Sequence, residues 1–234
     1  MSKFRVGVLT CIWQRHELFT AFADHWEYLN GRFKNVEFVF VAVGSEGKSS
    51  KDICETTLFE YHHYPNRPLS NKWNYGSNIL RYKNIDAAIF LGSDDFICED
   101  TLQRLLQNVS DGYDFVGLQD CYLLNAPTKE LVYFNGYDKG RSGETVGIGR
   151  CLSADLLKAL NYSPWRSGLN CRLDGSMQRK LRRISYSKMS FKCRHIDGFA
   201  VDVKTGVNIT PFTKDLPTAP KELITKIPVL NGYL

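Results

Sequence analysis

The sequence predicts an α/β fold with a mostly parallel central sheet and helices on both of its faces. Apolar runs of strand length alternate with segments whose apolar residues recur at helical spacing through the first half of the chain. The run at residues 36–43 is apolar at nearly every position, which is typical of a central parallel strand covered on both faces. Strands that alternate with helices in this way form a parallel sheet between helical layers.

The elements follow one another in a regular order up to residue 118. Apolar runs predict strands at residues 4–12, 36–43, 59–64, 86–91 and 113–118. Apolar residues three or four apart predict helices at 17–29, 71–82 and 101–109. The second half is less regular, and there we expect a strand at 131–134, a glycine-rich loop at 139–149, helices at 154–160 and 173–183, strands at 191–196 and 199–203, and a proline-containing tail from 211.

Composition narrows the class of protein. The chain has 234 residues and a net charge of +5, a mild excess that suits a protein handling anions. Its seven cysteines include no Cys-x-x-Cys pair, so we expect neither a disulfide framework nor a zinc ribbon, and a cytoplasmic location. The first residues run straight into a predicted strand, so we expect no signal peptide. No apolar stretch approaches the length of a membrane span.

The sharpest local feature is the acidic segment Ser93-Asp94-Asp95, which follows the apolar strand predicted at 86–91. Ligands of parallel α/β sheets bind at the carboxyl ends of strands. Two adjacent carboxylates in an apolar setting repel each other unless a cation compensates them. Mg²⁺ and Mn²⁺ take oxygen ligands and bridge phosphates. An exposed turn that caps the next helix is the alternative.

This segment resembles the acidic "DxD" motif of GT-A-fold glycosyltransferases, and the chain is similar to the family 2-like group and to small virus-encoded members. That resemblance implies a Rossmann-like GT-A sandwich and a Mn²⁺ or Mg²⁺ ion on Asp95. It also implies that Ser93 or Asp94 touches the ribose or reaches the metal through water. A viral enzyme of this kind would work in the host cytoplasm.

Other segments resemble the donor-binding parts of the same family. The segment at 10–17 is similar to the loop after the first strand, which places Thr10 and Arg15 against the nucleotide. Glu46 follows the second strand, where the family often has an acid near the base. The segment at 71–76 is similar to a helix motif in which Asn74 matches, and Lys72 would supply a cation to the diphosphate.

The second half carries the residues expected on the acceptor side. Gly149 and Arg150 belong to a segment that resembles a glycine-bearing acceptor loop. Asp174, at the start of the helix predicted at 173–183, is the candidate catalytic base, since inverting members have a carboxylate there. His195 is a candidate further metal ligand, because many GT-A enzymes carry a late histidine.

Together these features predict one GT-A-like domain over 1–234. Residues 1–118 would form the nucleotide-sugar-binding half, 119–210 the acceptor-side half, and 211–234 a C-terminal tail. The predicted reaction moves a sugar from a nucleoside diphosphate sugar to a hydroxyl of a glycan, glycolipid, glycoprotein or modified DNA base, with inversion. Two alternatives stay open: a sugar nucleotidyltransferase, and a non-catalytic nucleotide- or carbohydrate-binding module on a degenerate scaffold.

Overall fold

The computed structural model describes residues 3–208, 211–213 and 215–233. Strands and helices alternate in the first half, as the periodicity predicts. In chain order the elements are β1 (Phe4–Ile12), α1 (His16–Arg32), β2 (Val36–Gly44), α2 (Lys48–Glu55), β3 (Glu60–His63), α3 (Leu69–Leu80), β4 (Ala87–Phe90), β5 (Asp95–Ile97), α4 (Glu99–Ser110), β6 (Phe115–Leu118), β7 (Cys121–Asn125), β8 (Glu130–Phe134), β9 (Arg150–Ser153), α5 (Ala154–Ala159), α6 (Leu173–Leu181), β10 (Lys188–Phe191), η1 (Cys193–Ile196), β11 (Ala200–Lys204), η2 (Lys221–Lys226) and η3 (Pro228–Tyr233).

The larger sheet has seven strands in the order β10-β6-β9-β4-β1-β2-β3. Its strands pair in parallel except β9, which runs antiparallel to both β4 and β6. The order places β1 and β4 at the centre, and their carboxyl ends lie side by side. The central mostly parallel sheet expected from the sequence is therefore confirmed.

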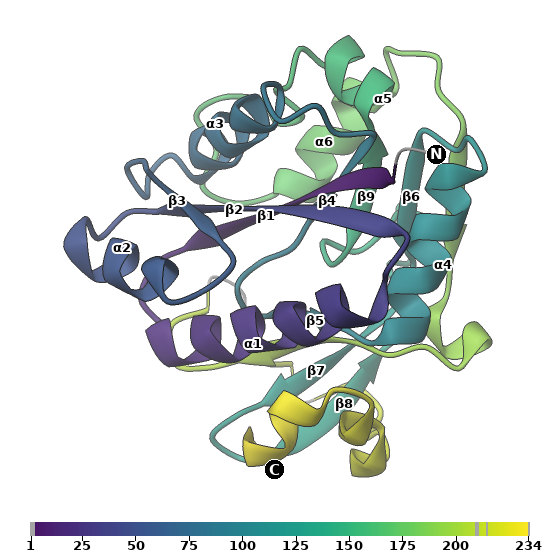
Figure 1. Ribbon diagram of the computed structural model, residues 1–234. Helices are drawn as coiled ribbons and strands as arrows, with labels where there is room; N and C mark the ends of the chain where they lie inside the picture. Colours follow the sequence, from purple (N-terminus) through teal and green to yellow (C-terminus); the bar gives the residue numbers. More distant parts are fainter. Residues whose placement is uncertain (1–2, 209–210, 214, 234) are drawn as a thin grey trace.

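Helices cover both faces of this sheet (Figure 1). Side chains of α1 and α4 pack on one face, in a core that includes Phe19, Phe22 and Trp26. Side chains of α3, α5 and α6 pack on the other face with Leu9 and Phe90. Both cores are apolar and almost fully excluded from water, so burial of both faces holds the sheet between its helical layers.

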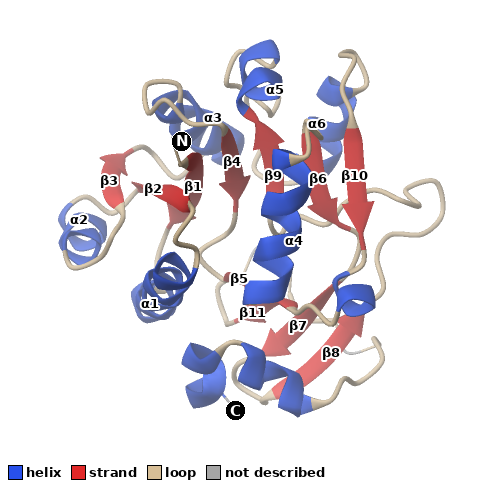
Figure 2. Cartoon of the chain, turned by 45° about the vertical axis from the view of Figure 1, so that its right-hand side comes forward, coloured by secondary structure: helices blue, strands red, loops and turns tan. Residues whose placement is uncertain are grey.

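A second sheet of four strands, in the order β5-β11-β7-β8, lies beyond the carboxyl end of β4 (Figure 2). In it, β11 pairs antiparallel with β5 and parallel with β7. The short helices η2 and η3 lie close to it and to α1, and Ile224, Ile227 and Leu230 join the core there. Residues 221–233 thus pack on the molecule.

Several expected elements differ from the observed ones. Residues 193–196 form η1 rather than a strand, because β10 has already ended at Phe191. Residues 150–153, expected within an acceptor loop, form the antiparallel strand β9 between β4 and β6. The elements α2, β5 and β7 are not predicted by the sequence pattern. Their short lengths give too few turns or alternations for periodicity to stand out.

Glycine at position 76 allows α3 to pack closely against the sheet. A Cβ built there would lie 2.6 Å from Leu9 Cδ1 and 2.8 Å from Val43 Cγ2, so the helix or both side chains would have to move. A Cβ on Gly31, near the end of α1, would have no atom within 4 Å. Gly76 and Gly31 therefore allow a controlled comparison of alanine substitution at a crowded and at an open helical position.

We expect Gly76→Ala to lower the free energy of unfolding by about 1–3 kcal/mol, because the methyl group overpacks the α3 contact. Gly31→Ala should leave it unchanged or raise it by up to about 1 kcal/mol, because alanine favours helix where space allows. Urea denaturation of both variants measures the two values. Equal effects at the two positions would contradict the close approach of α3.

Candidate active site

A tight turn brings the acidic segment to the carboxyl end of β4. The Asp95 amide donates to the carbonyl of Gly92 at 3.0 Å, and the Gly92 amide donates to Asp95 Oδ2 at 2.7 Å. A Cβ on Gly92 would lie 2.5 Å from Asp94 Oδ1 and 2.9 Å from Asp95 Oδ2. Glycine is therefore needed at position 92 for the two carboxylates to fold back over the turn.

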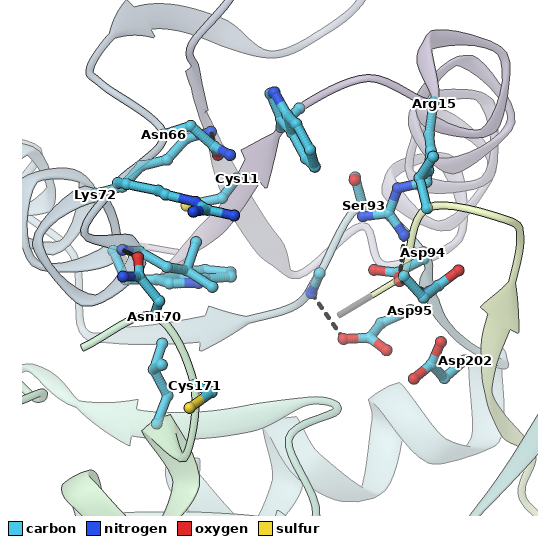
Figure 3. A pocket seen from close by; sticks show the side chains of 18 of the residues that line it. Cys11, Arg15, Asn66, Lys72, Ser93, Asp94, Asp95, Asn170, Cys171 and Asp202 are labelled. Atoms are coloured by element: carbon cyan, nitrogen blue, oxygen red, sulfur yellow. Dashed lines mark hydrogen bonds and ion pairs between the residues drawn. The ribbon is translucent and has the colours of Figure 1, made fainter. Parts of the chain in front are cut away.

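Asp95 and Asp202 face each other across two neighbouring strands. Asp95 begins β5 and pairs in antiparallel register with Asp202 of β11, so both side chains project from the same sheet position. Figure 3 shows them close together with Asp94. Burial, and then the charges of Asp202 and Asp94, raise the pKa of Asp95 well above its usual value. Burial and the charge of Asp94 raise the pKa of Asp202 to about 7.

Positive charge reaches these carboxylates from two sides. Lys204, two residues after Asp202 on the same strand, forms an ion pair with Asp202 Oδ2. Arg15 forms an ion pair with Asp94 Oδ2, which also accepts a hydrogen bond from Asn208 Nδ2 at 2.7 Å. Asp202 Oδ1 is buried and has no hydrogen-bond partner among the described residues. The group therefore retains an unsatisfied acceptor where negative charge is concentrated.

Glu46 positions the loop that carries Arg15. Gln14 and Arg15 both have left-handed backbone conformations, with φ of 53° and 52°. Glu46 Oε2 accepts a hydrogen bond from the Gln14 amide at 2.7 Å and lies 3.0 Å from His16 Nε2. Glu46 thus fixes the conformation of the loop at 13–15, but it does not itself line the cavity described next.

A cavity of about 770 Å³ opens over the carboxyl ends of β1 and β4, a volume in the range of small-molecule sites. Among the expected residues it brings together Arg15, Lys72, Ser93, Asp94, Asp95 and Asp174. Asp202 and Lys204 join them from β11. The remaining lining residues are Cys11, Trp13, Asn66, Arg67, Leu69, Trp73, Gly92, Asn170, Cys171, Arg172, Leu173, Val207 and Asn208.

Asp174, in the first turn of α6, is oriented by two donors. Arg150 Nη1 donates to Asp174 Oδ1 at 2.9 Å, and the Tyr137 hydroxyl donates to Oδ2 at 3.0 Å. Arg150 is 2% exposed, and Thr145 accepts its other hydrogen bonds through the backbone carbonyl at 2.7 Å and Oγ1 at 3.2 Å. The Asp174 side chain keeps 31% exposure and faces the cavity.

Lys72 and Ser93 lie in the cavity wall with few partners. Lys72 is fully buried, and its ammonium donates to the Ile12 carbonyl at 2.6 Å and to Asn66 Oδ1 at 3.3 Å. Burial lowers the pKa of Lys72. Ser93 is 1% exposed, and its hydroxyl has no partner among the described residues. Its hydroxyl is therefore free for a ligand.

Besides Glu46 and Arg150, which contact cavity residues or their loop from outside the lining, four further expected residues do not reach the cavity. Thr10 is fully buried inside β1, which continues to Ile12. Asn74 joins α3 to the loop between α5 and α6, donating to the Trp165 carbonyl at 2.9 Å and accepting from its amide at 3.1 Å. Gly149 has φ of 67° and packs near Leu105. His195 is exposed on η1, so the structure does not bring it to the acidic group.

Asp202, rather than His195, lies opposite Asp95. The sequence offers only a weak signal for it, one acid inside the apolar strand predicted at 199–203. Its partner Asp95 lies far away in the chain, and only the pairing of β11 with β5 joins them. Arg150 was expected on the acceptor side, but its contact with Asp174 depends on the position of β9.

No protein-family model matches the chain, and no curated protein matches it in sequence. Solved structures do match. A Pyrobaculum calidifontis mannosyltransferase solved with GDP-Man and Mn²⁺ aligns at TM-score 0.57 and 15% identity, over 88% of this chain and 58% of its own. A 4-diphosphocytidyl-2C-methyl-D-erythritol synthase from Anaerococcus prevotii aligns at TM-score 0.54 and 12% identity, over 98% and 96%. The inositol-1-phosphate CTP transferase of T. maritima aligns at TM-score 0.54 and 13% identity, over 99% and 98%.

These structures define the fold class. The chain has a GT-A-like α/β fold in common with this mannosyltransferase, the synthase and the CTP transferase. The expected GT-A resemblance is confirmed at the level of the fold. In the part of the chain that the structure describes, no helix is both long and apolar enough to cross a membrane.

The facing carboxylates should give the folded protein a particular pH dependence. A carboxyl whose pKa rises on folding binds its proton more tightly when folded, so stability falls as pH rises from its ordinary value towards the raised one. For Asp202 that interval runs from 3.8 to about 7. Asp202→Asn removes this contribution.

We expect the stability of the native chain relative to Asp202→Asn to decline between pH 4 and about pH 7, by at most about 1.4 kcal/mol per pH unit. Urea denaturation across this range, with EDTA present to remove divalent ions, measures the difference. A stability difference that is constant from pH 4 to 7 would contradict the assigned environment of Asp202.

Proposed function

We propose that the chain is a glycosyltransferase that moves a sugar from a nucleoside diphosphate sugar to an acceptor hydroxyl, with a divalent ion and with inversion. The observation that carries this proposal is the layout of one cavity. Asp94, Asp95 and Asp202 concentrate negative charge on one of its walls, and the separately oriented carboxylate of Asp174 lines the same space. A glycosyl transfer needs both a neutralised diphosphate and a base for the acceptor hydroxyl.

The acidic wall fits Mn²⁺ or Mg²⁺ in its chemistry. Its donors are oxygens, and Asp202 Oδ1 has no described partner. Burial, and then the charges of neighbouring carboxylates, raise the pKa values of Asp95 and Asp202. Among the described residues, no group of three or more potential ligands is already arranged around a metal position. We assign Asp95 and Asp202 as the residues that would hold the ion, which supplies neutralising charge to the diphosphate.

The protein's own groups would carry the remaining steps. Asp174 takes the proton from the acceptor hydroxyl as that oxygen attacks the anomeric carbon. The bond from the anomeric carbon to the diphosphate oxygen breaks, the nucleoside diphosphate leaves with the electron pair, and direct attack of this kind inverts the configuration. Arg150 and Tyr137 fix both Asp174 oxygens, so the carboxylate has one orientation before substrate binds. Ser93 offers its free hydroxyl to the donor, and Arg15 orients Asp94.

A sugar nucleotidyltransferase is the second candidate. The observation in its favour is the extent of two alignments. The synthase and the CTP transferase each align with this chain over almost their whole length. Such an enzyme handles a triphosphate and releases pyrophosphate, and a glycine-rich loop after the first strand commonly cradles the phosphates. Here that loop, 13–15, contains no glycine. Release of pyrophosphate from a nucleoside triphosphate and a sugar phosphate would favour this candidate over ours.

The first test is a thermal-shift panel with uridine, guanosine, thymidine and cytidine diphosphates, with and without Mn²⁺. A ligand at about 100 times its Kd stabilises the folded state by about 2.7 kcal/mol, which is easily seen in the melting temperature. We expect one nucleotide to give a Mn²⁺-dependent shift that Asp95→Asn and Asp202→Asn abolish. A shift that survives in Asp95→Asn would contradict the assignment of Asp95.

Asp174→Asn separates the chemical step from donor binding. We expect it to retain the Mn²⁺-dependent shift and to lower the rate of sugar transfer by about 10²–10⁴-fold, because the acceptor proton loses its base. Asp155→Asn is the matched control, since Asp155 is exposed in the first turn of α5 and lies outside the cavity. Transfer at the native rate by Asp174→Asn would exclude Asp174 as the base.

A further inference from the structure

Two loops are joined to form one rim of the cavity. The Leu69 amide donates to Asn170 Oδ1 at 3.1 Å, and the Ser70 amide donates to the Leu169 carbonyl at 2.8 Å. The Leu169 amide in turn donates to Ser70 Oγ at 2.9 Å. Asn71 Oδ1 accepts two further hydrogen bonds from residues 167–168. The segments 66–71 and 167–172 are therefore held in a fixed relation.

This rim lies across the cavity from the acidic wall. Figure 3 shows Asn66, Asn170 and Cys171 on the side opposite Asp95 and Asp202. The rim carries uncharged amides and two arginines, Arg67 from the first loop and Arg172 from the second. Any charge it binds is therefore negative.

The positive side chains around the cavity are unequally engaged. Arg15 pairs with Asp94, Lys204 pairs with Asp202, and Lys72 donates to the Ile12 carbonyl. Arg67 and Arg172 are exposed, and neither side chain has a hydrogen-bond or ion-pair partner in the described part of the chain. These two guanidinium groups are the cations of the cavity wall that remain available to a ligand.

Arg172 also lies beside the acceptor end of the site. It directly precedes α6, two residues before Asp174, with φ of 56°. It is not needed to neutralise Asp174, because Arg150 already does so. An acceptor whose hydroxyl reaches Asp174 would therefore occupy the cavity that Arg172 and Arg67 also line.

We propose that Arg67 and Arg172 form an anion subsite for the acceptor, which carries a phosphate or carboxylate near the hydroxyl that receives the sugar. This rests on the proposed function. Guanidinium groups bind such anions through paired hydrogen bonds and stay charged at all relevant pH values. The donor's diphosphate belongs to the opposite wall, at Asp95, Asp202 and Lys204. The acceptor class thus narrows to phosphorylated or acidic glycans and phosphate-bearing polymers or lipids.

Cys171 provides a probe of this subsite in the native protein. It adjoins Arg172 and is exposed, whereas the other six cysteines are buried. The experiment compares alkylation of Cys171 by iodoacetate, an anion, with alkylation by neutral iodoacetamide. Arginines that attract anions raise the rate ratio of the two reagents. Arg166→Gln is the matched control, because Arg166 is an exposed arginine of the same region outside the cavity lining.

We expect the ratio of iodoacetate to iodoacetamide rates to fall about two- to threefold in each of Arg67→Gln and Arg172→Gln, the size expected for removing one nearby unit charge in water. Arg166→Gln should keep the native ratio. In the native protein, inorganic phosphate should slow the alkylation of Cys171 by iodoacetate more than sodium chloride of the same ionic strength does. A ratio that both variants leave unchanged, or that phosphate does not lower, would overturn the proposal.

A second part of the alkylation experiment tests whether the two arginines bind the donor or the acceptor. With the nucleoside diphosphate and Mn²⁺ at saturation, phosphate should still protect Cys171 from iodoacetate. Loss of the charge preference on addition of nucleotide alone would assign the arginines to the donor and overturn the proposal. The alkylation test needs no nucleotide, so its result can be interpreted even if the thermal-shift panel shows no donor binding. Failure of the proposed function would appear in the thermal-shift panel, and failure of the anion subsite would appear in the alkylation rates.

Discussion

Asp95 and Asp202 repel each other across two paired strands, and the surrounding architecture limits that repulsion. The pairing of β5 with β11 fixes the carboxylates opposite each other, and burial makes their shared charge more costly. Lys204 offsets part of it from the same strand, while Arg15 engages neighbouring Asp94. Since the raised pKa values persist with these cations in place, the site retains a demand for positive charge. Such perturbed groups in a cleft are typical of functional sites.

Several residues fix the positions of the cavity side chains without contributing a functional side chain to the cavity. Glu46 holds the left-handed turn from which Arg15 extends, and Gly92 allows the acidic turn to close. Gly76 lets α3 lie close enough to the sheet for Lys72 to reach the Ile12 carbonyl. None of these supports is itself chemically reactive, yet each sets the position of a side chain that faces the cavity. Loss of one would disturb the site without removing a ligand-binding group.

The cavity is divided by charge into two unlike walls. One is acidic and suits a cation. The other carries amides and two arginines that have no partner among the described residues, and it suits an anion directly. Asp174 contributes to the same cavity, with Arg172 two residues before it along the chain. The proposed transfer would bring two negatively charged substrates into one cavity. Recognition of one by the proposed metal and of the other by arginine would keep the two substrates in separate places.

The sequence by itself determined the alternating elements of the first half, because strand and helix periodicities are local properties of about ten residues. It also determined the acidic turn and Asp174, since each lies at the end or start of such an element. Tertiary structure alone decided which distant residues complete the site. Asp202 rather than His195 meets Asp95 because β11 pairs with β5, and Arg150 meets Asp174 because β9 inserts between β4 and β6. Strand register over long sequence separations depends on the packing of the whole chain, and short strands such as β5 and β9 carry too little periodicity to reveal it.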